Sequence, residues 1–179
     1  REYPDITLIL IPGAHQFAGQ RIGNGTRTNP LLTKKDGLAS SDYGLLAPFV
    51  DGLLEGSTPS ATIIDGTENS YAWTYSKQFE KSRKDFTLAV QYSAVPQLYQ
   101  SRLKLGFGMM LDYDGVRPWT TKAPYYTNHF TPGETKLALH NAMHAGDGYT
   151  WIWSEQAFMM PYCGHKNRDA NVPKEYIDA

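Results

Sequence analysis

The sequence predicts an α/β protein built from parallel strands with flanking helices, and more specifically part of a TIM-type (β/α)8 barrel. Short apolar runs of strand length alternate four times with longer segments whose apolar residues recur at helical spacing. Those short runs are apolar at successive positions, as is typical of strands buried on both faces of a parallel sheet. Acidic and aromatic residues also collect where the runs end, which is where (β/α)-barrels place their functional groups.

Four strands are expected. The first covers residues 6–11, a β-branched and Leu run, and the second covers residues 61–66, which end in Asp65-Gly66. The third covers residues 103–113, where glycines permit close packing, and the fourth covers residues 149–155.

Helices are expected between these strands, and their boundaries follow from capping signals. Thr131-Pro132-Gly133-Glu134 combines a cap, a first-position proline and a capping box, so a helix should run from there to Ala145 and stop at Gly146. The other expected helical segments are residues 41–54, residues 71–84, a helix opened by Val95-Pro96 and a C-terminal start within residues 171–179. Residues 86–92 could extend the second of these or form a short strand.

The chain is expected to be one domain, or part of one, over residues 1–179. A complete eight-stranded barrel takes about 250 residues, so four strand–helix units are about half of one. The sequence therefore favours the C-terminal half of a barrel, with the missing N-terminal half or another chain as its partner. A self-contained doubly wound sheet is the structural alternative.

Composition excludes several classes of function. Lys and Arg total 17 against 18 Asp and Glu, so no strong positive field would recruit nucleic acid. No apolar run approaches the roughly 20 residues that a membrane helix needs. A single cysteine rules out an intrachain disulfide. Aromatic residues make up 13%, and their flat faces suit sugar rings as well as cores.

Paired carboxylates at the strand ends suggest glycoside cleavage, in which one carboxyl group protonates the leaving oxygen and another attacks the anomeric carbon or activates water. Glu68 and Glu155 are the preferred catalytic pair, with Asp112 in reserve. For Asp65, Asp112 and Asp114, capping of the following backbone is an equally good interpretation. The residues expected to bind substrate are His15, Asp65, Tyr71, Tyr113, Trp119, Trp153 and Gln156.

The segments ATIIDGTENSYAW, KLGFGMMLDYD and YTWIWSEQ resemble the later strand ends of bacterial (β/α)8 proteins related to glycoside hydrolases. In that group an acidic residue after a D-G-x-E-like turn and a W-x-x-x-E-like final strand line the sugar cleft. Carried over by position, the resemblance implicates Asp65, Glu68, Asp112 and Glu155. It implies a polysaccharide or oligosaccharide substrate. Together with the Asn24-Gly25-Thr26 sequon, the predicted polysaccharide substrate leads us to expect a secreted or extracytoplasmic protein.

Other chemistries receive less support. His140 and His144 stand four apart on one predicted helix, but the zincin motif needs Glu after the first His and Asn141 stands there. No metal or cofactor is therefore expected, and a metal-dependent hydrolase would need a cluster of His and carboxylate residues at the mouth, where only His15 is well placed. The main alternative to an enzyme is a non-catalytic carbohydrate-binding or structural barrel.

Overall fold

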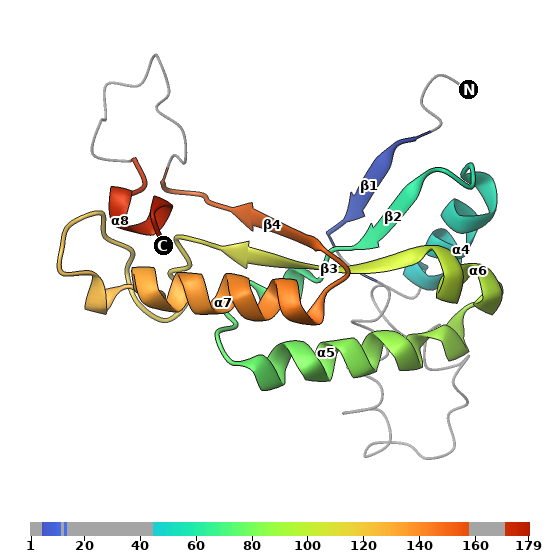
Figure 1. The fold of residues 1–179 in the computed structure, drawn as a ribbon, viewed down its shortest axis with the longest axis horizontal. Coiled ribbons are helices and arrows are strands. Elements are labelled where there is room, and N and C mark those ends of the chain that lie inside the picture. The colour runs from blue at the N-terminus through green and yellow to red at the C-terminus, as the bar shows by residue number, and fades with distance from the viewer. Residues whose placement is uncertain (1–4, 12, 14–44, 158–170) are drawn as a thin grey trace.

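The computed structural model describes residues 5–11, 13, 45–157 and 171–179. Within them, four strands form one all-parallel sheet in the order β1-β2-β3-β4, which curls into a half-barrel (Figure 1). The strands are β1 (Thr7–Leu10), β2 (Thr62–Asp65), β3 (Leu103–Met110) and β4 (Tyr149–Trp153). The α/β class with parallel strands is thus confirmed, and each strand lies inside the residue range expected for it.

Helices connect the strands in the alternating order that a parallel sheet requires. In chain order they are α4 (Leu46–Gly56), η2 (Glu68–Ser70), α5 (Ser76–Ala89), η3 (Val90–Tyr92), α6 (Pro96–Arg102), η4 (Tyr125–Thr127), α7 (Pro132–Ala145) and α8 (Lys174–Ile177).

Local sequence signals explain most of these boundaries. Helix α7 begins and ends where its capping signals predicted, because Thr131 accepts a hydrogen bond from the Glu134 backbone N–H while the Glu134 carboxylate accepts one from the Thr131 N–H. Residues 86–92 continue α5 and η3 and form no strand. The segment before Ser76 is not part of α5, so the helix expected over residues 71–84 begins later than the pattern suggested.

The principal core lies between one face of the sheet and helices α4 to α7. Alternation along the strands places Ile63, Leu103, Leu105 and Phe107 on this helix-facing side, where they pack against a shared set of buried helical side chains. That set is Val50, Leu54, Phe79, Phe86, Ala89, Tyr99 and Ala142. Figure 1 shows α5 and α7 running side by side beneath β3.

A second, smaller core closes the carboxyl end of β3. It joins Met109 and Leu111 to Phe130, to Ala138 of α7 and to Tyr176 of α8, with Val172 and Ala157 completing the cluster. This packing brings α8 beside the loops that follow the strands.

On the opposite face of the sheet, the Trp151 side chain of β4 extends over β3. An ideal Cβ atom built on Gly108 would sit 2.6 Å from Trp151 Cζ2, so the indole occupies the space above this glycine. The Trp151 Nε1–H then donates to the Gly66 carbonyl oxygen at 2.8 Å, reaching from β4 to the end of β2. A residue with no side chain at position 108 is what allows this contact.

We expect Gly108→Ala to lower the free energy of unfolding by about 1–3 kcal/mol, because the added methyl group overlaps the Trp151 ring. Urea unfolding followed by circular dichroism measures the change. Gly133→Ala is the matched control: nothing lies within 4 Å of its added Cβ in the first turn of α7, so its stability should stay equal or rise slightly. Equal stability of the two variants would contradict the close contact between Gly108 and the Trp151 ring.

Candidate functional site

A short segment after β2 runs beside the carboxyl half of β3 and carries two of the candidate residues. Thr67 Oγ1 donates to the Gly106 carbonyl at 2.7 Å, and Ser70 Oγ donates to the Gly108 carbonyl at 2.6 Å. The backbone of this segment also bonds to β3, since the Met110 N–H donates to the Tyr71 carbonyl at 3.3 Å. These bonds hold Glu68 and Tyr71 at the end of the sheet where β3 finishes.

The backbone of this segment is strained immediately before Glu68. Thr67 has φ 48° and ψ 67°, in the left-handed region that β-branched residues rarely adopt. Its side chain is fully buried, and Ser70 bonds back to the Thr67 carbonyl through both its N–H and its hydroxyl. Such strain persists only where surrounding bonds over-determine it, and it is frequent next to functional groups.

Tyr71 sits over the sheet next to Trp151. The two rings meet edge to face, with centroids 5.4 Å apart, and a Cβ on Gly108 would lie 3.0 Å from Tyr71 Cε1. Burial raises the pKa of the Tyr71 hydroxyl, and the negative charges of Glu68 and then Glu155 raise that pKa further. The phenol therefore stays protonated, as a hydrogen-bond donor, well above neutral pH.

Glu155 is positioned by Asp112. The Asp112 carboxylate is completely buried and accepts hydrogen bonds from three successive backbone N–H groups, those of Glu155, Gln156 and Ala157. The loop leaving β4 is thereby tied to the end of β3. Asp112 thus acts on the backbone in the way that the capping interpretation anticipated, although here the receiving segment is a loop.

These contacts place three of the predicted residues at the same end of the sheet: Glu68, Tyr71 and Glu155. Both carboxylates influence the same phenol although they come from loops after different strands. Glu68 is partly buried and Glu155 is exposed. Trp153, the last residue of β4 and two residues before Glu155, is 46% exposed and offers an open aromatic surface.

Asp65 and Trp119 lie elsewhere. Asp65 is 1% exposed, shares the helix-facing side of β2 with Ile63, and its charge adds to the burial that raises the pKa of Tyr99. Trp119 packs against Tyr176 in the smaller core, with ring centroids 5.1 Å apart.

The remaining expected residues are placed as follows. The Tyr113 ring meets His129 edge to face at 4.9 Å, and Gln156 Nε2 donates to exposed Asp114 at 2.7 Å. His15 lies outside the described residues.

Sequence reasoning did not select Thr67, Ser70 or His129. His129 Nε2 lies 2.9 Å from the Ala72 carbonyl oxygen and so steadies the residue after Tyr71. The hydroxyl residues on either side of Glu68 carried a usable signal, because Thr and Ser next to a glycine turn often bond to nearby backbone. No local signal pointed to His129.

Among the described residues, no group of three or more His, Cys, Asp or Glu side chains is arranged to hold a metal ion. His140 and His144 do share an exposed face of α7, where their rings stack 6.3 Å apart. Likewise, none of the helices in the described ranges is long and apolar enough to cross a membrane.

Comparison with known proteins finds no matching family model, no matching curated protein and no matching solved structure. The similarity to glycoside hydrolases therefore stays a prediction.

We expect Asp112→Asn to lower the free energy of unfolding by about 2–3 kcal/mol, because the amide can no longer accept bonds from all three backbone donors through two anionic oxygens. Asp114→Asn is the control, since Asp114 is exposed and should shift stability by less than about 0.5 kcal/mol. Denaturant unfolding compares the two, and similar losses would argue against the role given to Asp112.

The Tyr71 hydroxyl should titrate above its ordinary pKa, and Glu68→Gln or Glu155→Gln should each bring that pKa down. The sign follows because a neighbouring negative charge disfavours the tyrosinate, so removing the charge favours ionisation. Ultraviolet difference titration of each protein against its own Tyr71→Phe version isolates this tyrosine. If neither substitution changes the pKa of Tyr71, the two carboxylates do not act on its hydroxyl.

Proposed function

We propose that this chain is a glycoside-hydrolase-like protein of TIM-type barrel architecture that cleaves a polysaccharide or oligosaccharide with Glu68 and Glu155. The observation that carries the proposal is that the segments bearing Glu68 and Glu155 are both tied to β3 at the carboxyl ends of the parallel strands, the first through Thr67 and Ser70 and the second through Asp112. Two carboxyl groups at one end of the sheet, one acting as acid and the other as base or nucleophile, are the elements that hydrolysis of a glycosidic bond requires.

The chemistry divides between the two carboxyl groups. One donates its proton to the leaving oxygen, and the other attacks the anomeric carbon or removes a proton from an attacking water molecule. Tyr71 remains a neutral donor because its pKa is raised, so it can hydrogen-bond to the carboxylate that stays ionised. That bond would hold the anionic group in place as positive charge develops on the sugar ring.

The surroundings suit a sugar substrate. Exposed Trp153 supplies a flat apolar surface for the face of a pyranose ring, while Tyr71 and Glu155 supply polar groups near it. Asp112 serves as a positioning residue, because its bonds to the backbone fix the loop from which Glu155 projects.

Hydrolysis of a broad panel of polysaccharides by the chain and by Glu68→Gln and Glu155→Gln tests this proposal. Each substitution should lower the rate by about 10²–10⁴-fold, the usual contribution of a general acid or base. Glu80→Gln, at an exposed carboxylate of α5, is the matched control and should leave the rate unchanged.

Aryl glycosides with activated leaving groups then assign the roles. The variant that lacks the proton donor should keep most of its activity on such substrates, because their leaving groups need no protonation, whereas the other variant should not. Cleavage by all variants at the original rate would overturn the assignment of the pair. Glycan binding without cleavage, lost in Trp153→Ala, would instead favour the non-catalytic carbohydrate-binding function.

A further inference from the structure

Three side chains with metal-binding atoms share the exposed face of α7. His140, Met143 and His144 stand at positions i, i+3 and i+4 of this helix, so the second and the third are both neighbours of the first. All three are exposed, and Met143 is 61% exposed although its side chain is apolar. The buried residues Ala138 and Ala142 precede the two histidines by two positions each, which is about 200° around the helix. The three side chains therefore lie on the side of α7 that faces away from the core.

The two imidazole rings of this group already lie close to each other. They are parallel to within 6°, with their centroids 6.3 Å apart. Metal–nitrogen bonds are about 2 Å long, so an ion that binds one nitrogen of each ring needs those nitrogens within about 4 Å of each other. Since both side chains are exposed, rotation about their side-chain bonds can bring the nitrogens this close.

The backbone that carries the three side chains is held in place by other parts of the chain. Asn141 Nδ2 donates to the Thr74 carbonyl at 2.7 Å, and Arg83 Nε donates to the Ala145 carbonyl at 2.7 Å. An ion bound here would have to order only the ligand side chains, which lowers the entropic cost of binding. The group also reaches into the last turn of α7, where the negative end of the helix dipole favours a cation.

We propose that His140, Met143 and His144 bind a copper ion. Imidazole sites hold Cu²⁺ more tightly than the other divalent first-row ions, and the thioether sulfur of methionine is a soft ligand that suits Cu⁺. Zinc sites instead use thiolate, imidazole and carboxylate ligands, so the methionine distinguishes this group from a zinc site. The residue after the first histidine, Asn141, argues against a zincin but has no part in a copper site of this kind.

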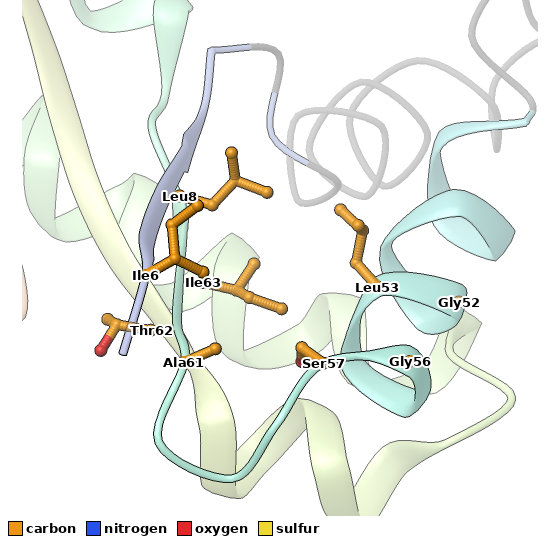
Figure 2. Close-up of a pocket in the computed structure, with 9 residues that line it drawn as sticks. All are labelled: Ile6, Leu8, Gly52, Leu53, Gly56, Ser57, Ala61, Thr62 and Ile63. Carbon is orange, nitrogen blue, oxygen red and sulfur yellow. The ribbon is translucent and has the colours of Figure 1, made fainter. Parts of the chain in front are cut away.

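The apolar pocket beside β1 offers no comparable ligands. It has a volume of about 350 Å³ and lies between helix α4 and strands β1 and β2. Figure 2 shows Ile6, Leu8, Leu53 and Ile63 directed into it. None of the side chains that line it contains nitrogen or sulfur, so copper binding by this chain would not be explained by the pocket.

Titration of the full chain with Cu⁺ under anaerobic, reducing conditions, with a coloured copper chelator as competitor, tests this inference. His140→Ala and His144→Ala should each weaken copper binding by at least about 10-fold, since the loss of even an outer-shell partner of a metal ligand costs that much. Leu137→Ala is the matched control at another exposed residue of α7, and it should leave the copper affinity unchanged.

Met143→Leu tests the choice of metal, because it removes the sulfur and keeps an apolar side chain of similar size. It should weaken Cu⁺ binding and leave the weaker binding of Zn²⁺ by the two histidines, measured by calorimetry, unchanged. Unchanged Cu⁺ affinity in Met143→Leu would overturn the assignment of copper.

Circular dichroism of every variant confirms that it is folded. A folded wild-type chain that binds no copper would overturn the inference. Copper binding unaffected by both histidine substitutions would do so as well, because the ion would then be held elsewhere. The measurement uses no glycan, so its outcome is independent of the proposed hydrolysis.

Discussion

The close packing of other segments on β3 is the constraint on which the rest of this structure depends. Both faces of the strand are buried almost throughout, and its two glycines keep one face flat. The carbonyl oxygens of Gly106 and Gly108 receive Thr67 and Ser70, while Trp151 lies over the bare Cα of Gly108. The segment that carries Glu68 and Tyr71 therefore takes its position from β3, more than from the strand that precedes it in sequence.

A second link to β3 positions the other carboxylate. Asp112 follows the strand closely, and its buried carboxyl group accepts hydrogen bonds from backbone N–H groups of the loop that leaves β4. Removing a charge from water is costly unless several hydrogen bonds compensate, so this loop is drawn to the Asp112 side chain. Glu68 and Glu155 therefore lie in segments that are each anchored to a different part of one strand.

The strands and the best-capped helix could be predicted from sequence because their signals are local: uninterrupted apolar runs, and a capping box at Thr131 and Glu134. The directions in which the strand side chains point could not be predicted from sequence. In TIID both isoleucines are buried, so no polar–apolar alternation reveals which face Asp65 occupies, and it lies on the helix-facing side. The positions of Trp119 and His129 could not be predicted either, because their contacts with Tyr176 and Ala72 join residues far apart in the sequence.

Strand β4 connects the candidate site to the edge of the sheet. Trp151 points across the sheet and is held by Gly66 and Tyr71, whereas Trp153, one step further along the same side, is largely open. An aromatic side chain at this position can meet a sugar ring or a neighbouring strand through the same apolar face.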